Sequence, residues 1–231
     1  MKRIYREVRV APTGGGWGIW LDARTLRTPA RQPLVLPRPG LAEAIAAEWD
    51  AQTEKVVPAT MPLMRLAATA IDRMAAQRGQ AIDEIVGYAN TDLVCYRAER
   101  PAELVARQNA CWQPLVDWVT LRFDAPLLVT TGVVPKAQPQ AAITAIRAAV
   151  KALDPFWLTA LHSATTACGS IVIGLALVER RLDAEGAWQA SQLDETFQIE
   201  AWGEDAEAAA RRAALKRDIA ATARFMDLLR A

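Results

Sequence analysis

The spacing of prolines and glycines near the start of the sequence excludes a helix there. Pro29, Pro33 and Pro37 lie close together, and proline at this density also confines strands to edges or ends. Before them, β-branched residues alternate with charged ones up to Gly14–Gly16, and Trp17–Leu21 follows. The pattern predicts a strand, a glycine turn and a second strand. Further short extended pieces are predicted at 25–28 and 33–36.

From Gly40 onwards the sequence changes to alanine-rich patterns with a period of 3.6 residues. The run LAEAIAAEWDAQ places Leu41, Ile45, Glu48 and Trp49 near one another on a helix. Later helices are predicted at 62–76, 82–94, 101–122, 140–153, 155–179, 184–202 and 205–229. Within these, Pro114 predicts a kink or a break. Leu127–Val134 is apolar and β-branched between prolines, which predicts a short strand or an extended connector.

These patterns together predict an α+β protein. A small β-rich N-terminal domain is expected at residues 1–60, followed by a larger α-helical bundle domain at residues 61–231. With 231 residues the chain can bury a sizeable core, and 52% hydrophobic with 23% charged residues is an ordinary globular balance. The 27 basic and 26 acidic side chains give a net charge of +1, which argues against a dedicated nucleic-acid binder.

Catalytic and metal-binding patterns are weak in this sequence. It contains no GxGxxG, GxxxxGK[ST], HExxH or GxSxG motif, and its single histidine, His162, is expected to cap or pack in a helix. Cys95, Cys111 and Cys168 form no CxxC pair and are expected to be small buried hydrophobes in a reducing compartment. No cofactor and no metal ligand set is predicted.

No membrane span or targeting segment is predicted either. The longest nearly apolar stretch, 164–178, is shorter than the roughly 18–20 residues that a span requires, and we expect a buried helix there. The opening MKRIYREVRVAP lacks the apolar core of a signal peptide. The sequence therefore predicts a soluble protein.

Acidic residues are concentrated in one segment near the C-terminus. Between Arg181 and Arg211 there is no lysine or arginine, whereas eight aspartates and glutamates lie there. On a continuous helix, spacings of three and four residues place Glu195 in a stripe with four others. The stripe consists of Trp188, Gln192, Glu195, Ile199 and Trp202.

A carboxylate in such a stripe has three interpretations. Glu195 could be a buried general base with a raised pKa, the partner of an arginine in a structural ion pair, or part of an exposed binding face in which tryptophans are the apolar anchors. Spacing favours the last two over the first but does not choose between them.

Several runs, in order, resemble one known family. They begin with LDARTLRTPARQPLVLP, LAEAIAAEWDAQ and MPLMRLAATAIDR, and continue with TDLVCYRAERPAEL, QNACWQPLVDW, GSIVIGLAL and LDETFQIEAWGEDAEA. Together they cover most of the chain and are similar to the F-type ATP synthase assembly chaperones of alphaproteobacteria and mitochondria. These chaperones handle the alpha subunit of the soluble catalytic head.

The resemblance implies an assembly chaperone, not an enzyme. It would hold unassembled alpha subunit, shield the surface that later faces the beta subunit, and release it as the alpha–beta ring forms. The family's acid near the WG pair corresponds to Glu195, and its EW pair corresponds to Glu48 and Trp49. The client-binding residues expected from the stripe and the resemblance are Glu195, Trp202, Asp194, Gln198, Glu200, Trp49 and Glu48.

The expected partner is therefore the alpha subunit, with no nucleic acid, membrane insertion or small-molecule substrate. The expected compartment is the bacterial cytoplasm, or the mitochondrial matrix for a mature organellar form. One alternative is a small-molecule enzyme that uses Asp194, Glu195 or Glu200 for acid–base chemistry, which would require a concave pocket with paired acids. Another is a purely structural subunit of a larger assembly.

Overall fold

The computed structural model describes residues 2–132 and 136–231, which form two compact units. Unit 1 contains residues 1–78, 154–160 and 221–231, and unit 2 contains residues 79–153 and 161–220. Two helices, α6 (Pro155–Cys168) and α10 (Ala206–Arg230), therefore contribute residues to both units. The predicted division at residue 60 follows different boundaries and stays a prediction.

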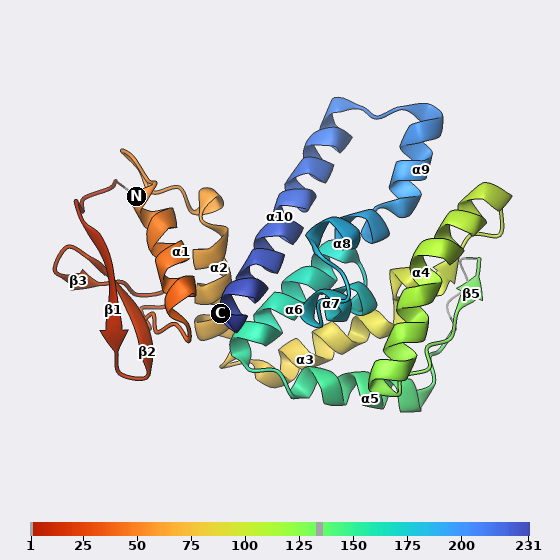
Figure 1. Ribbon diagram of the computed structural model, residues 1–231, viewed down its shortest axis with the longest axis horizontal. Helices are drawn as coiled ribbons and strands as arrows, with labels where there is room; N and C mark the ends of the chain where they lie inside the picture. Colours follow the sequence, from red (N-terminus) through yellow and green to blue (C-terminus); the bar gives the residue numbers. More distant parts are fainter. Residues whose placement is uncertain (1, 133–135) are drawn as a thin grey trace. The chain divides into compact units, whose positions relative to one another are not determined.

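Unit 1 contains a three-stranded antiparallel sheet in the order β1–β2–β3 (Figure 1). The predicted hairpin is present: β1 (Val8–Thr13) pairs with β2 (Gly16–Leu21), and the turn between them uses Gly15 at φ +95°. The third strand, β3 (Arg24–Thr25), pairs with β2. Beyond it, the chain forms an isolated bridge between Trp17 and Leu36, within the second predicted extended piece.

Helix α1 (Pro39–Asp50) covers one face of this sheet, because its apolar positions recur every four residues. Leu41, Ile45 and Trp49 are buried, and so is Ile19 on β2. The chain then continues through η1 (Pro58–Thr60), α2 (Pro62–Thr69) and the π-helical turn η2 (Ala70–Met74). The sequence pattern did not distinguish the last two.

Unit 2 is mainly helical. Before its first long helix lie α3 (Arg78–Gly87), η3 (Tyr88–Thr91), η4 (Leu93–Cys95) and β4 (Tyr96–Arg97). Its long helix α4 (Ala102–Phe123) continues through Pro114, so of the two predicted alternatives, a kink or a break, the break does not occur. Next come β5 (Thr130–Thr131), parallel to β4, and α5 (Gln140–Lys151). The strand alternative for 127–134 is thus correct at 130–131, while Val133 and Val134 lie outside the described residues.

The centre of unit 2 is α7 (Ile171–Val178), in which residues 171–177 are all buried. One helix was predicted over 155–179, and this prediction is wrong at Gly169 and Ser170. Gly169 has φ +64°, and the Ser170 hydroxyl accepts a hydrogen bond from the N–H of Ile173 (3.0 Å), so a new helix begins there. The fully buried Asp92 fixes this start, since it accepts from Ser170 Oγ (2.6 Å) and from the N–H of Val172 (3.1 Å).

Two shorter helices follow, α8 (Ala184–Ser191) and α9 (Leu193–Trp202), where one helix was predicted over 184–202. That prediction is wrong at Gln192, whose φ of −111° and ψ of 17° interrupt the helix. The Ser191 hydroxyl donates to the carbonyl of Trp188 (2.9 Å), a bond that commonly bends helices.

The observed fold is α+β, as predicted, with short strands near the N-terminus followed by many helices. Among the described residues, no helix combines the length and the apolar character that a membrane crossing demands.

Candidate functional site

Helix α9 carries five of the seven residues that the sequence marks as a binding site. The break at Gln192 separates it from α8, and Gly203, with φ +81°, ends it. Asp205 then caps α10 by accepting from the N–H groups of Glu207 and Ala208, both at 2.9 Å. Both ends of α9 are therefore defined by local backbone geometry.

One side of α9 is attached to α4. Gln108 Nε2 donates to Asp194 Oδ1 (2.8 Å), and Arg107 donates to Glu200 Oε2 (2.6 Å). The Arg107 guanidinium also lies 5.2 Å from the ring centre of Phe197. Because the hydrogen bonds to Glu200 and Glu103 favour the charged form, the pKa of Arg107 is raised. Asp194 and Glu200 thus act as attachments within unit 2.

The anchor on α4 is itself held firmly. Gln108 is buried, its side-chain oxygen accepts from the N–H of Ala98 (2.8 Å), and its carbonyl accepts from the buried Arg97 (2.9 Å). One turn further along α4, Trp112 Nε1 donates to the carbonyl of Ala190 at the end of α8 (2.8 Å). These bonds fix α4 against the segment that leads into α9.

A second side of α9 is attached to α10 through Arg212. Its Nη2 donates to Thr196 Oγ1 (3.0 Å), and its Nη1 lies 3.3 Å from Glu204 Oε1. The guanidinium also stacks over the ring of Trp188 on α8, 5.3 Å from its centre. Arg212 therefore connects α8, α9 and α10.

The third side of α9 is exposed and carries Glu195, Gln198 and Trp202. Their spacings of three and four residues place them on one side of the helix. Trp202 is 80% exposed, which is unusual for the side chain with the largest apolar surface. Among the described residues, the Glu195 side chain forms no ion pair or hydrogen bond, so the structural ion pair considered for it is not found there. We call these three residues the α9 face.

The predicted five-residue stripe is therefore shorter than expected. Glu195, Ile199 and Trp202 remain on neighbouring positions of α9, but Trp188 belongs to α8, where it lies under Arg212 and Lys216. The break at Gln192 is the reason, because helical spacing does not continue across it.

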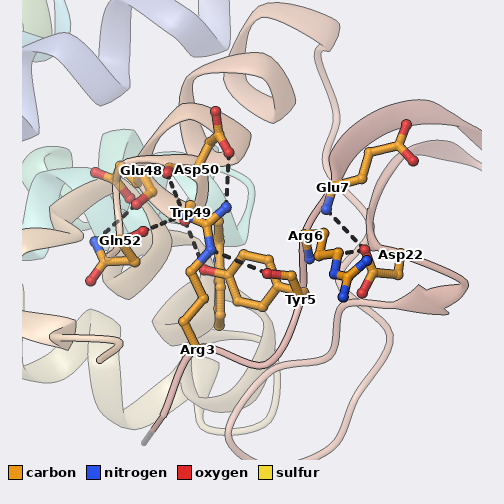
Figure 2. Close-up of polar contacts among 9 residues, drawn as sticks. All are labelled: Arg3, Tyr5, Arg6, Glu7, Asp22, Glu48, Trp49, Asp50 and Gln52. Carbon is orange, nitrogen blue, oxygen red and sulfur yellow. Dashed lines mark hydrogen bonds and ion pairs between the residues drawn. The ribbon is translucent and has the colours of Figure 1, made fainter. Parts of the chain in front are cut away.

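The other two predicted residues, Glu48 and Trp49, lie on α1 in unit 1. Figure 2 shows Tyr5 reaching this helix, where its hydroxyl donates to the carbonyl of Trp49 (2.7 Å). The Tyr5 and Trp49 rings meet edge to face with centres 5.7 Å apart, and Trp49 is buried. Arg3 completes the cluster with an ion pair to Asp50 (3.1 Å).

Glu48 performs a structural task in this unit. Its two carboxylate oxygens accept from the N–H groups of Leu63 and Met64, both at 2.8 Å, which caps the first turn of α2. Partial burial raises the pKa of Glu48, and the two hydrogen bonds oppose that shift. Contact of Glu48 or Trp49 with a client stays a prediction.

Two surface hollows can be described from their lining residues. One surface hollow is lined by Lys2, Arg3, Glu54 and Lys55, and another, of about 430 Å³, is lined by residues of α4 together with Arg181; neither includes an α9 residue. Within residues 2–132 and 136–231, no group of three or more potential metal ligands comes together. The imidazole of His162 lies 3.5 Å from the Glu84 carboxylate, and both side chains are partly buried.

The cysteines fit the predicted packing role. Cys95 and Cys168 are buried, Cys111 is partly buried, and all are free thiols. Burial raises the pKa of both Cys95 and Cys168 to about 12, which suppresses the reactive thiolate.

The sequence did not identify the residues that hold α9 in place. Arg107, Gln108 and Arg212 lie in ordinary amphipathic helices, and their partners are between 16 and 93 positions away in the chain. The only available hint was charge, since the acidic segment 182–210 contains no basic residue and needs cations from elsewhere to neutralise it.

Comparisons with known proteins give one consistent answer. The sequence model of the ATP12 chaperone protein family matches residues 2–120. The crystal structure of Atp12 from Paracoccus denitrificans has 43% sequence identity and a TM-score of 0.94, with 99% of this chain and 98% of that chain covered. A protein of Agrobacterium tumefaciens described as a chaperone has 42% identity and the same TM-score, with 99% and 86% covered.

A more distant curated relative is the mitochondrial protein atp12 of Schizosaccharomyces pombe. It is 23% identical over 214 residues, which cover 87% of this chain and 74% of that protein.

Proposed function

The chain belongs to the ATP12 chaperone family, and on that premise we propose that it is an assembly chaperone of the F-type ATP synthase that binds the unassembled alpha subunit. It would shield the surface of alpha that later faces beta, until the alpha–beta ring forms. The family assignment confirms the resemblance found in the sequence, and the word chaperone in the descriptions of the family and of the Agrobacterium tumefaciens protein favours a binding protein over an enzyme.

The observation that carries the proposal is the α9 face. An aromatic side chain that is 80% exposed gains binding energy when a partner covers it, and tryptophan is frequent among the residues that dominate interfaces. The helix beneath it is attached on two sides by Arg107, Gln108 and Arg212, so binding need not order it. Glu195 and Gln198 add polar groups beside the indole.

The face alone is too small for a stable complex. A specific interface of standard size buries about 1,600 Å² in total, which needs some 20–30 residues on each side. We therefore assign the α9 face the role of a central anchor surrounded by further contacts. Because relatives are known from bacteria and from mitochondria, we infer action in the bacterial cytoplasm or the mitochondrial matrix.

Binding of purified alpha subunit to variants of the α9 face tests this proposal. Trp202→Ala should weaken binding about tenfold or more, as expected for a central aromatic anchor, while the melting temperature stays near that of the parent. Leu121→Ala on α4 is the matched control, since it removes an apolar side chain that is 87% exposed. Equal affinity of both variants and the parent would refute the assigned role of α9.

Glu195→Gln separates the remaining interpretations of that residue. The substitution keeps size and removes charge, so binding should weaken while the fold is unchanged if Glu195 contacts the client. A variant that loses stability instead would mean that Glu195 serves the fold.

A further inference from the structure

The first forty residues carry an unusual charge. They contain eight lysines and arginines and only two acidic residues, whereas the whole chain has a net charge of +1. Five of these cations, all exposed, lie on the sheet or in the segments directly before and after it. They are Arg6, Arg9, Arg24, Arg27 and Arg31. Within the described part of the chain, none of the five has a carboxylate within ion-pair distance.

The register of the sheet gathers part of this charge on one face. Arg9 on β1 is opposite Trp20 on β2, and Trp20 is opposite Thr25 on β3, so the three side chains project to the same side. Arg27 follows two residues after Thr25, and between them Leu26 is buried on the other side. We call Arg9, Trp20, Thr25 and Arg27 the outer sheet face.

Helix α1 covers the opposite face. Ile19 and Leu26 are buried on that inner side, and α1 contacts both β1 and β2 (Figure 1). Arg9, Thr25 and Arg27 are by contrast exposed. The outer sheet face is therefore a solvent-accessible side of unit 1.

Contacts within the chain itself hold the side chains of the outer sheet face in place before any partner binds. The Trp20 ring packs against Gly18, where an added Cβ would be 2.9 Å from the ring, and the Arg9 guanidinium carbon lies over the ring, 5.0 Å from its centre. A cation–π contact of this kind uses the face of the indole, and the guanidinium has five N–H donors with which it can also bind a carboxylate. Arg27 is held similarly, since its Nη1 donates to the carbonyl of Arg31 (2.9 Å).

From this geometry we propose that the outer sheet face is a second docking surface, separate from the α9 face, which binds a carboxylate-rich segment of a partner protein. Two oriented guanidinium groups fit carboxylates through paired, charge-assisted hydrogen bonds, and Trp20 provides apolar contact between them. The charge favours an acidic chain over any neutral or basic one.

Two other polyanions fit the surface less well. The affinity of a nucleic acid depends on many phosphate contacts, and the outer sheet face offers only two arginines for them. Interfacial membrane binding buries an apolar face in the bilayer, whereas Trp20 is partly buried and is already in contact with Gly18 and Arg9.

Fluorescence anisotropy with three labelled probes tests the proposal directly: a peptide of ten glutamates, a ten-residue oligothymidine and vesicles containing phosphatidylserine. The full chain should bind the peptide, with affinity falling as salt rises. Arg9→Gln combined with Arg27→Gln should weaken peptide binding about tenfold or more. The control, Arg65→Gln combined with Arg217→Gln, removes the same charge from exposed sites on α2 and α10 and should bind like the parent.

Each contrary result has a definite meaning. Equal losses in both double variants would mean non-specific charge attraction, and unchanged binding in the first would place the site elsewhere; both overturn the proposal. Tighter binding of the oligonucleotide or the vesicles than of the peptide would overturn it in favour of that other partner. None of these results depends on the alpha subunit, so they leave the proposed function to its own test.

Discussion

The buried carboxylate of Asp92 makes the stability of unit 2 depend on pH. This side chain is fully buried, and it accepts from Ser170 Oγ, from the N–H of Val172 and from the N–H of Val94 (3.1 Å). Burial raises its pKa to about 6, even though these hydrogen bonds favour the charged form. Since Asp92 fixes the start of α7, its ionisation acts on the core that supports α4 and α8.

The sign and size of the effect follow from linkage. A carboxyl group whose pKa is higher in the folded state than in the unfolded chain, where it is about 3.9, stabilises the fold most when it is protonated. That contribution is fully present below about pH 4 and is lost as pH rises through about 6. Between pH 7 and pH 5, Asp92 alone should therefore add about 1.3 kcal/mol to the free energy of unfolding.

Urea unfolding followed by circular dichroism at pH 7 and pH 5 measures this contribution. Asp92→Asn cannot ionise, so its change in unfolding free energy between the two pH values should differ from that of the parent by about 1.3 kcal/mol. The amide of the variant lies beside backbone N–H groups, which destabilises the fold equally at both pH values. This constant cost cancels when the change in unfolding free energy with pH is compared between the two proteins. Identical pH dependence in the two proteins would show that the carboxylate stays ionised and that its hydrogen bonds outweigh its burial.

Three further outcomes follow from the packing. Glu48→Ala should lower the unfolding free energy by about 1–2 kcal/mol because the first turn of α2 loses its cap, whereas Glu43→Ala on the same helix should change it little. Gly174→Ala places a methyl group 2.6 Å from a threonine hydroxyl and should cost about 1–3 kcal/mol in urea unfolding; an unchanged midpoint would contradict the packing of α7 on α6. With a thiol reagent at pH 8, native protein should leave Cys95 and Cys168 unreacted, and rapid reaction of all three thiols would contradict their burial.

The sequence predicted those helices and strands correctly whose structure depends only on residues within the element or next to it. The hairpin before Leu21 follows from a glycine turn, and α1 follows from apolar residues at helical spacing. The two helix breaks were missed for different reasons. Ser170 receives its partner Asp92 from 78 residues earlier, which no local pattern contains, while the bond from Ser191 to Trp188 is local but is made by a residue that also occurs inside helices.

The candidate site also combines residues that the sequence placed correctly with contacts that it could not predict. Glu195 and Trp202 were placed on one face by spacing, and the structure keeps them there because both belong to α9. Asp194 and Glu200 carry carboxylates, as Glu195 does, so the sequence could not show that Gln108 and Arg107 hold the first two. The sequence did not predict the outer sheet face, because the net charge of the whole chain is only +1. The excess of basic residues is evident only when the first forty residues are counted separately.

Co-expression of this chain with its cognate alpha subunit, without beta, tests the central claim most directly. Size-exclusion chromatography of the soluble fraction should show alpha eluting together with the chain, and alpha should aggregate when the chain is absent. Adding beta should release the chain and yield alpha–beta complexes. Aggregation of alpha in both cases, with the chain eluting alone, would contradict its assignment as the chaperone of the alpha subunit.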